Sequence, residues 1–322
     1  IGNEVTVTGM VVPKPKAADD APSAATDLHA QFAAAATAGQ LSFTAPTTTY
    51  GGSALSGELS YNVYVNDAAP LTGKVNAGSS AVVPVQAREG MNTFVVTLTN
   101  AAGASPKARL SAYAGYDTPK PIEKLTLNVD AARRADLTWT APTATEHGGF
   151  LGSLTYDLIR ITGTDTTQVT NGISDVHFAE VLPEGPLMGY RYAVRAHNQS
   201  QVTTWTNSNN AVVGSPIEPP FFDEFANAAD AELYTVIDNN NDQASWAWDK
   251  DPYTEQTAYR YHWSDTEKAD DWLLLPPLRL RAGTVYTFQF KAKSNGTDYT
   301  ERFEVKWGQA PNPAGLTTVI LN

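Results

Sequence analysis

Two stretches of the chain repeat almost the same alternation of apolar and polar residues. They are LSFTAPTTTYGG at 41–52 and LTWTAPTATEHGG at 137–149. Alternation with a period of two predicts β-strands with one buried face, and the glycine pair that follows predicts a turn. A second alternating run follows each turn, SYNVYVN at 60–66 and TYDLIRI at 155–161. The pattern therefore indicates an internal duplication of a strand–turn–strand unit.

The duplication extends further along the chain, because NTFVVTLTNAAGAS at 92–105 matches YRYAVRAHNQSQ at 190–201. Short strands, frequent turn signals and almost no helical periodicity predict an all-β fold with two β-sandwiches of about 100 residues each. Both repeats resemble fibronectin type III, or immunoglobulin-like, domains. The residues that carry this resemblance are an aromatic residue in the second strand, a tyrosine in the third and a Y-x-V-x-A-x-N sixth strand: Phe43, Trp139, Tyr61, Tyr156 and Tyr192 to Asn198. The first repeat departs from the family by having Phe94 in place of the sixth-strand tyrosine.

Proline-rich segments at 13–25, 117–124 and 215–222 separate the repeats, and such segments form stiff, extended joints. The alternating run NEVTVTGMVV precedes the first joint and is a strand of a preceding module or an N-terminal extension. The predicted organisation has four parts. They are an N-terminal strand, linker or module remnant at 1–21, fibronectin type III repeats at 22–116 and 117–215, and a third domain at 216–322.

The third domain does not continue the repeat. Five of the seven Trp residues lie beyond Pro220, and the phrase VIDNNNDQASWAWD occupies 236–249. Alternating oxygen ligands at Asp238, Asn240 and Asp242 suit a hard cation such as calcium. The loop is not an EF-hand, because Gln243 stands where the sharp turn needs glycine. The alternative is an ordinary turn, since Asp and Asn favour turn conformations without any metal.

Three further motifs follow this order: FFDEFAN at 221–227, KADDWLLLPPLRL at 268–280 and ERFEVKWGQAPNPAGLTTVIL at 301–321. Together with the Asp/Asn loop they resemble the cleaved-adhesin, or choice-of-anchor J, family. Its members are jelly-roll sandwiches related to MAM domains and occur in surface adhesins of Bacteroidetes. The resemblance implies a structural calcium ion whose ligands come from Asp238, Asn240, Asp242, Asp270 and Glu224.

The third domain departs from this family in two ways. Asn240 replaces the usual Asp, which lowers the negative charge of the ligand set. The sequence also stops at Asn322, several strands before a complete jelly roll. We therefore expect either that the protein continues past this residue or that the domain exposes apolar strand edges.

The run TAYRYHWS at 257–264 places Tyr259, Tyr261 and Trp263 on one face of a predicted strand. Aromatic faces in a row can stack on sugar rings, so these residues are the candidate ligand-binding platform. The alternative, which the pattern favours, is that the rings fill a sandwich core.

Composition narrows the function. The chain has 322 residues, no Cys and a net charge of −12, which excludes disulfides and argues against nucleic acid or an anionic membrane surface as partners. No apolar run is long enough for a transmembrane segment. No catalytic or phosphate-binding motif occurs, and the five His residues are scattered, so the sequence predicts a non-catalytic protein.

The leading hypothesis is an exported bacterial adhesin, secreted or attached to the outer-membrane surface. In it, fibronectin type III spacers present a ligand-binding jelly roll to carbohydrate or to a host or cell-surface protein. We expect a monomer. A non-catalytic accessory region of a larger secreted hydrolase, either a protease or a glycosidase, and a purely structural stalk are the alternatives.

Overall fold

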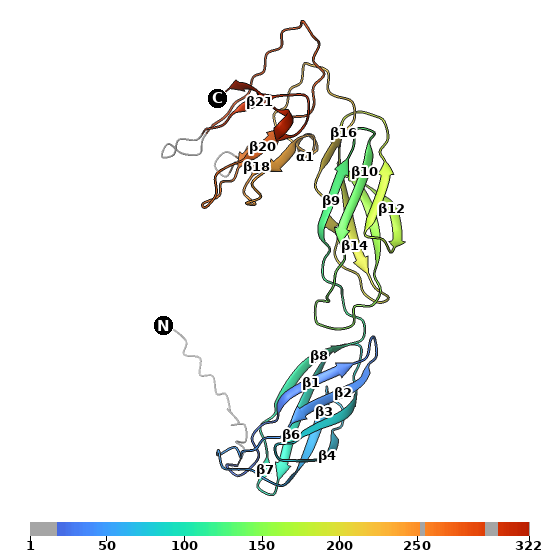
Figure 1. Cartoon of the computed structure of the whole chain (residues 1–322), viewed down its shortest axis with the longest axis vertical. Helices are drawn as coiled ribbons and strands as arrows, with labels where there is room; N and C mark the ends of the chain where they lie inside the picture. The colour runs from blue at the N-terminus through green and yellow to red at the C-terminus, as the bar shows by residue number, and fades with distance from the viewer. Residues whose placement is uncertain (1–17, 252–254, 294–301, 322) are drawn as a thin grey trace, which may run out of the picture. The chain divides into compact units, whose positions relative to one another are not determined.

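The computed structural model describes residues 18–251, 255–293 and 302–321 (Figure 1). Within these residues the regular elements are β-strands, apart from the short helix α1 (Ala228–Ala231) and one 3₁₀ turn at Pro313–Gly315. The all-β prediction is therefore confirmed. The predicted strand NEVTVTGMVV lies outside the described residues.

The first repeat is a sandwich of two antiparallel sheets. One sheet has the order β1-β2-β5, and the other has the order β4-β3-β6-β7 with β8 also paired to β6. The strands are, in chain order, β1 (Thr26–Phe32), β2 (Ala38–Thr44), β3 (Glu58–Val65), β4 (Leu71–Asn76), β5 (Ser80–Gln86), β6 (Gly90–Asn100), β7 (Gly103–Ala104) and β8 (Ala108–Ala114).

The core of this sandwich consists of the apolar positions that the alternation predicts. Leu41 and Phe43 on β2 and Phe94 on β6 are all fully buried between the two sheets. The Phe43 ring meets the Tyr61 ring edge-on at a centroid distance of 5.5 Å. Such edge-to-face pairs add to the stabilisation from burial alone. Phe94 therefore fills the core at the position where the family has tyrosine.

The second repeat has the same arrangement of strands. One sheet has the order β13-β10-β9, and the other has the order β12-β11-β14-β15 with β16 also paired to β14. This shared order, a three-stranded sheet facing a five-stranded one, is that of an immunoglobulin-like sandwich. The strands are β9 (Glu123–Val129), β10 (Arg134–Thr140), β11 (Thr155–Thr162), β12 (Asp165–Ile173), β13 (His177–Val181), β14 (Met188–His197), β15 (Thr206–Asn207) and β16 (Ala211–Val213).

The second core contains a hydrogen-bonded tyrosine. Tyr192 on β14 is fully buried, and its hydroxyl donates to Glu180, which also accepts from Arg160 at 2.8 Å. Burial, and then the negative charge of Glu180, raise the pKa of Tyr192 above its usual value. Trp139 packs edge-on against Tyr156 at 5.3 Å, as Phe43 does against Tyr61. The duplication therefore includes the core contacts as well as the strand order.

Spatial proximity divides the chain into two compact units. The segments 142–155 and 196–203 of the second repeat group with residues up to Pro121, and the rest of the second repeat groups with the residues that follow Thr204. The domain boundaries predicted from the sequence are a different division and stay a prediction.

The third domain contains three separate two-stranded antiparallel ladders in its described residues. They are β17 with β20, β18 with β19, and β21 with β22. The jelly-roll part of the prediction therefore stays a prediction. The strands are β17 (Thr235–Asp238), β18 (Trp246–Lys250), β19 (Thr257–Tyr261), β20 (Asp271–Leu274), β21 (Val305–Trp307) and β22 (Thr318–Leu321).

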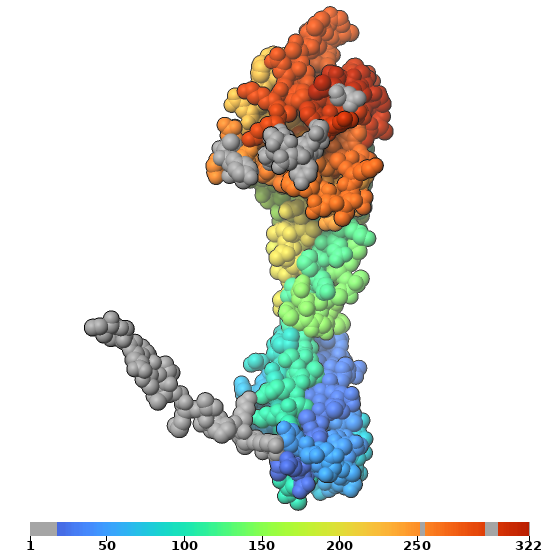
Figure 2. Space-filling view, turned by 90° about the vertical axis from the view of Figure 1, so that its left-hand side faces the viewer, coloured from blue at the N-terminus to red at the C-terminus, as the bar shows by residue number. Residues whose placement is uncertain are grey.

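Apolar side chains lie on the surface of the third domain. In Figure 2 the described part of the segment between β20 and β21 is orange-red and lies at the surface, and Val285 in it is 94% exposed. Phe288, Phe290 and Phe303 form a chain of ring contacts and are each about half exposed.

We predict that Leu158→Ala destabilises the second sandwich by about 2–5 kcal/mol, because the side chain is fully buried and its loss leaves a cavity. Urea unfolding, followed through amide signals of β10 and β14, measures this loss. Val181→Ala is the matched control, since Val181 is 61% exposed on the edge strand β13 and its truncation should cost no more than about 0.5 kcal/mol. Equal losses in the two variants would contradict the assigned core.

Candidate functional site

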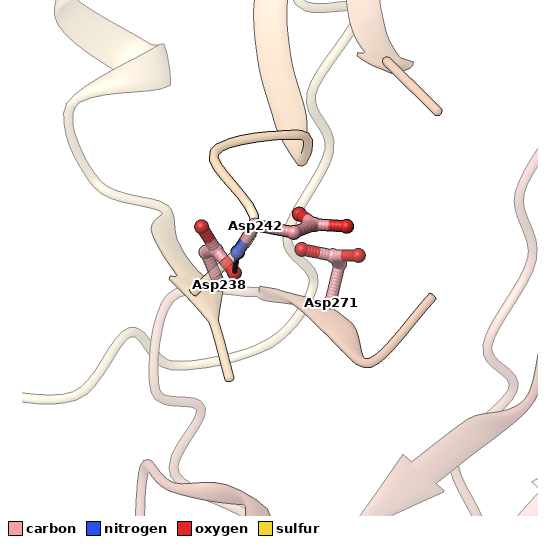
Figure 3. A group of neighbouring side chains, drawn as sticks. All are labelled: Asp238, Asp242 and Asp271. Atoms are coloured by element: carbon pink, nitrogen blue, oxygen red, sulfur yellow. Dashed lines mark hydrogen bonds between the residues drawn. The ribbon is translucent and has the colours of Figure 1, made fainter. Parts of the chain in front are cut away.

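Three carboxylates gather where the β17–β20 ladder ends (Figure 3). Asp238 is the last residue of β17 and lies opposite Asp271, the first residue of β20. Residues that face each other across an antiparallel pair project from the same side of the ladder. Asp242 reaches the same place from the loop that follows β17, and one oxygen from each carboxylate lies within 4.8 Å of the other two.

The loop after β17 folds back over Asp238. The Asp238 carboxylate accepts hydrogen bonds from the backbone N–H of Asp242 at 3.2 Å and of Gln243 at 2.9 Å. Asn241 and Gln243 have φ angles of +58° and +67°, a left-handed conformation that Asn adopts more readily than most residues. This tight turn brings the Asp242 side chain toward Asp271.

Two oxygens of this acidic group are buried without a hydrogen-bond donor among the described residues. They are Oδ2 of Asp242 and Oδ1 of Asp271. The other Asp242 oxygen accepts from the Ala244 N–H at 2.9 Å, and the other Asp271 oxygen accepts from the Tyr261 hydroxyl at 3.0 Å. Buried polar atoms normally have partners, and adjacent carboxylates repel one another. A hard cation would give the unpartnered oxygens a partner and would offset the repulsion between the carboxylates. The three carboxylates therefore fit calcium as ligands.

Asp270, which the sequence resemblance places among the ligands, lies on the opposite side of the ladder. Its backbone carbonyl accepts from Asn239 at 3.0 Å, and its carboxylate accepts from the side chains of Asn239 at 2.6 Å and Trp272 at 2.9 Å. These hydrogen bonds, first that from Asn239 and then that from Trp272, hold the pKa of Asp270 below its usual value. Asp271 takes its place in the acidic group because successive strand residues point to opposite faces.

Glu224, another predicted ligand, is exposed and does not belong to the group of three carboxylates. The Asn240 side chain donates to the Lys268 carbonyl at 2.8 Å. The group of three carboxylates thus contains two of the predicted ligands, Asp238 and Asp242, together with Asp271, which the sequence did not single out. The signal that could have identified it is the strand register, since pairing the end of VID with the start of DWL places Asp238 opposite Asp271.

The predicted aromatic platform is split by the structure. Tyr259 packs against Phe225 and Tyr234, at centroid distances of 5.7 and 5.1 Å, and its hydroxyl donates to the Ala231 carbonyl at 2.7 Å. These three rings form a small aromatic core under helix α1. Tyr259 therefore has the packing role that the sequence pattern favoured.

Tyr261 also packs internally, whereas Trp263 does not. The Tyr261 ring lies 5.4 Å from the ring of Trp246, its cross-strand partner, and its hydroxyl binds Asp271 of the acidic group. Trp246 also donates to the Asp271 carbonyl at 3.4 Å. Trp263 follows the end of β19 and is 72% exposed. The β18–β19 hairpin thus contacts the acidic group through Tyr261 and Trp246, and the exposed Trp263 follows its end.

A separate open cleft of about 590 Å³ lies at one end of the second sandwich. Arg133 and Glu184 in its lining are paired with each other at 3.0 Å, and Asp130 also lines it. The cleft shares no residue with the acidic group. Its lining consists mainly of the β9–β10 turn and the backbone of 211–216.

Comparison with known proteins gives a likeness in structure only. No protein-family profile and no curated protein sequence matches the chain. A two-domain fibronectin type III segment from chicken tenascin matches 59% of this chain and 99% of its own length, at 12% identity and a TM-score of 0.27. The FN1–FN3 domains of chicken CNTN1 match 60% of this chain and 67% of their own length, at 15% identity and a TM-score of 0.24.

None of the helices in the described ranges is long and apolar enough to cross a membrane.

We predict that the Tyr259 hydroxyl ionises with a pKa of about 12, well above its usual value of 10, because burial and then the charge of Asp223 disfavour the phenolate. The stability that depends on neutral Tyr259 is complete below pH 10 and is lost as the pH rises through about 12. Ultraviolet difference titration of wild type against Tyr259→Phe measures this value. A difference midpoint near 10 would instead mean that the ring is freely accessible, as a ligand platform requires.

Proposed function

We propose that this chain is a non-catalytic, exported binding protein. Its fibronectin type III sandwiches act as spacers, and its third domain binds a ligand outside the cell, either secreted or attached to the outer-membrane surface. A calcium ion held by Asp238, Asp242 and Asp271 stabilises the binding domain. The observation that carries the proposal is the convergence of these three carboxylates with two buried, unpartnered oxygens.

The chemistry of the donors favours calcium over a transition metal. The group offers carboxylate oxygens only, with neither the imidazole nor the thiolate ligands that select zinc, copper or iron. Calcium accepts carboxylates in mono- or bidentate form and completes its shell with carbonyl oxygens and water. Asp238, Asp242 and Asp271 would hold the ion, which would supply charge neutralisation and take no part in a reaction.

The position of the group supports a structural role for the ion. The acidic group contains the end of β17, the start of β20 and the loop that follows β17. Asp271 also contacts the β18–β19 hairpin through Tyr261 and Trp246. One ion at this place would tie two of the three ladders of the third domain together. The domain has small ladders and exposed apolar surface, so such a cross-link would contribute a large share of its stability.

The exposed indole ring of Trp263 is the best candidate for ligand contact. An aromatic ring that is accessible on one face suits stacking against a sugar ring, which supports carbohydrate as the ligand. A host or cell-surface protein is the second partner class, because tryptophan is enriched at the energetic centre of protein interfaces. The exposure of Trp263 favours both classes over a stalk without any ligand.

We predict that calcium raises the melting temperature of the third domain. A concentration of 100 times Kd would add about 2.7 kcal/mol. A gain of this size shifts the melting temperature of a domain of about 100 residues by roughly 10 °C or more. Differential scanning calorimetry with calcium and with chelator measures the shift, and calorimetric titration measures the affinity. An unchanged melting temperature, with no bound metal found by elemental analysis, would refute the site.

Asp242→Asn and Asp271→Asn separate the metal from general charge effects. Each substitution should weaken calcium binding at least about tenfold, since it removes a charged ligand. Each should leave the calcium-free domain as stable as before or slightly more so, because repulsion among the carboxylates falls. Asp265→Asn, at an exposed acidic position outside the group, is the matched control and should change neither quantity.

We predict that Trp263→Ala abolishes glycan binding while the calcium-dependent melting temperature is retained, because the side chain is exposed and lies outside the acidic group. Binding to an immobilised glycan panel, measured for wild type and variant, tests this. Val319→Ala is the control, at a residue about half exposed on β22. Wild-type binding to proteins but to no glycan would shift the proposal to a protein partner.

A further inference from the structure

The exit from the first repeat contains a buried carboxylate that the proposed function does not use. Asp117 is 0% exposed, and both of its oxygens accept hydrogen bonds. Oδ1 accepts from the Thr118 N–H at 2.8 Å and from Nδ1 of His147 at 3.0 Å. Oδ2 accepts from the backbone N–H of His147 at 2.7 Å and of Gly149 at 3.2 Å. Three of the four donors therefore belong to a loop about 30 residues away in sequence.

The Tyr113 side chain of the first repeat covers the His147 ring that donates to Asp117. The Tyr113 ring, from the end of β8, stacks on the His147 ring at 5.5 Å with an interplanar angle of 12°. Gly149 fits between Tyr113 and Asp117, where an added Cβ would lie 2.4 Å from the ring and 2.7 Å from the Asp117 Cβ. Only glycine fits this position without displacing one of them.

Backbone hydrogen bonds join the same two segments. Phe150 donates to the Gly115 carbonyl at 2.9 Å, and Asp117 donates to the Phe150 carbonyl at 3.1 Å. The Asn198 side chain donates to the Asp117 carbonyl at 2.9 Å. All of these residues belong to one compact unit. The Asp117 carboxylate thus lies at the centre of a hydrogen-bonded junction between residues 115–118, which follow β8, and the 144–150 loop.

The protonation state of Asp117 is coupled to the junction. Burial alone would raise its pKa, but hydrogen bonds from the side chain and backbone of His147, from Thr145 and from Gly149 outweigh burial and hold the pKa below its usual value. A group whose pKa falls on folding stabilises the structure above its unfolded pKa, and this contribution is lost as the pH falls through the folded value. The other titratable groups that face the junction are His147, Tyr113 and Glu89, whose side chain would contact a Cβ at Gly115.

We propose that Asp117, His147 and Gly149 form an acid-released latch that holds the 144–150 loop on the exit of the first repeat. At neutral pH the ionised carboxylate accepts from all four N–H donors. A protonated carboxyl is a weaker acceptor and places its own O–H toward donors, so acidification breaks the contacts of His147 and Gly149. The loop then separates from Tyr113 while both sandwich cores stay folded. The latch acts independently of calcium, whose proposed ligands lie in the third domain.

Hydrogen exchange of the full chain tests the latch. At neutral pH, Asp117→Asn should increase exchange of the 144–150 amides at least about tenfold, because the amide oxygen accepts less strongly and its NH₂ group opposes the loop donors. The exchange of Leu158 and Tyr192 in the buried core should stay unchanged and reports that the variant is folded. Wild type, corrected for intrinsic exchange, should keep protection of the same amides down to about pH 4, the usual pKa of an aspartate, and lose it as the pH falls further. Asp117→Asn should show no such step.

Two control variants isolate the carboxylate. Glu89→Gln removes the neighbouring acid beside Gly115 and Tyr113 and should keep the acid step. Asp130→Asn removes an exposed acid that caps its own turn and should leave the 144–150 amides unchanged. Equal protection of wild type and Asp117→Asn, or an acid step that persists in Asp117→Asn, would overturn the proposal. If Asp117→Asn loses protection of its core amides, His147→Ala is tested in its place. It should increase exchange of the loop by a smaller factor, because it removes only the Nδ1 hydrogen bond and the ring stacking.

Discussion

Side chains in a β-ladder alternate between two faces, and this constraint determines both the cores and the acidic group. On β2 it directs Leu41 and Phe43 into the first core, and on β10 it directs Leu137 and Trp139 into the second. On the β17–β20 ladder the same rule places Asp238 and Asp271 side by side on one face. In the sandwiches the residues that share this face are apolar and form the core. On the β17–β20 ladder two of the residues that share a face are carboxylates.

The chain stabilises buried carboxylates in two ways. Asp117 is surrounded by N–H donors, which compensate its loss of hydration and lower its pKa. Asp242 and Asp271 each retain an oxygen that is buried without a donor in the described structure. A negative charge can be buried only when donors or a cation compensate it. The first arrangement is complete within the chain, whereas the unpartnered oxygens of the second are the physical basis of the calcium proposal.

The architecture could be predicted from sequence because it depends on local, repeated signals. Alternation and glycine turns define each strand pair, and the repetition at 41–52 and 137–149 doubles the signal.

The site could be predicted only in part. Asp238 and Asp242 belong to one continuous loop, whereas the choice between Asp270 and Asp271 depends on the register of a strand about 30 residues away. A shift of one residue reverses the face of every side chain, so sequence resemblance alone could not decide it. The pattern also could not separate Tyr259 and Tyr261, which pack against other rings, from the exposed Trp263, since sharing a face does not say where the strand ends.

The difference in packing between the sandwiches and the third domain has a functional consequence. Each sandwich buries many apolar side chains, and in the first they form one contiguous core between the two sheets. The third domain has short ladders, an aromatic core of three rings and exposed apolar side chains, and therefore has less burial to offset the entropy of ordering its loops. Folding of such a domain is sensitive to any ion or partner that binds only the folded state. The distribution of buried surface along the chain therefore supports the proposal of stable spacers joined to a domain whose folding depends on a ligand.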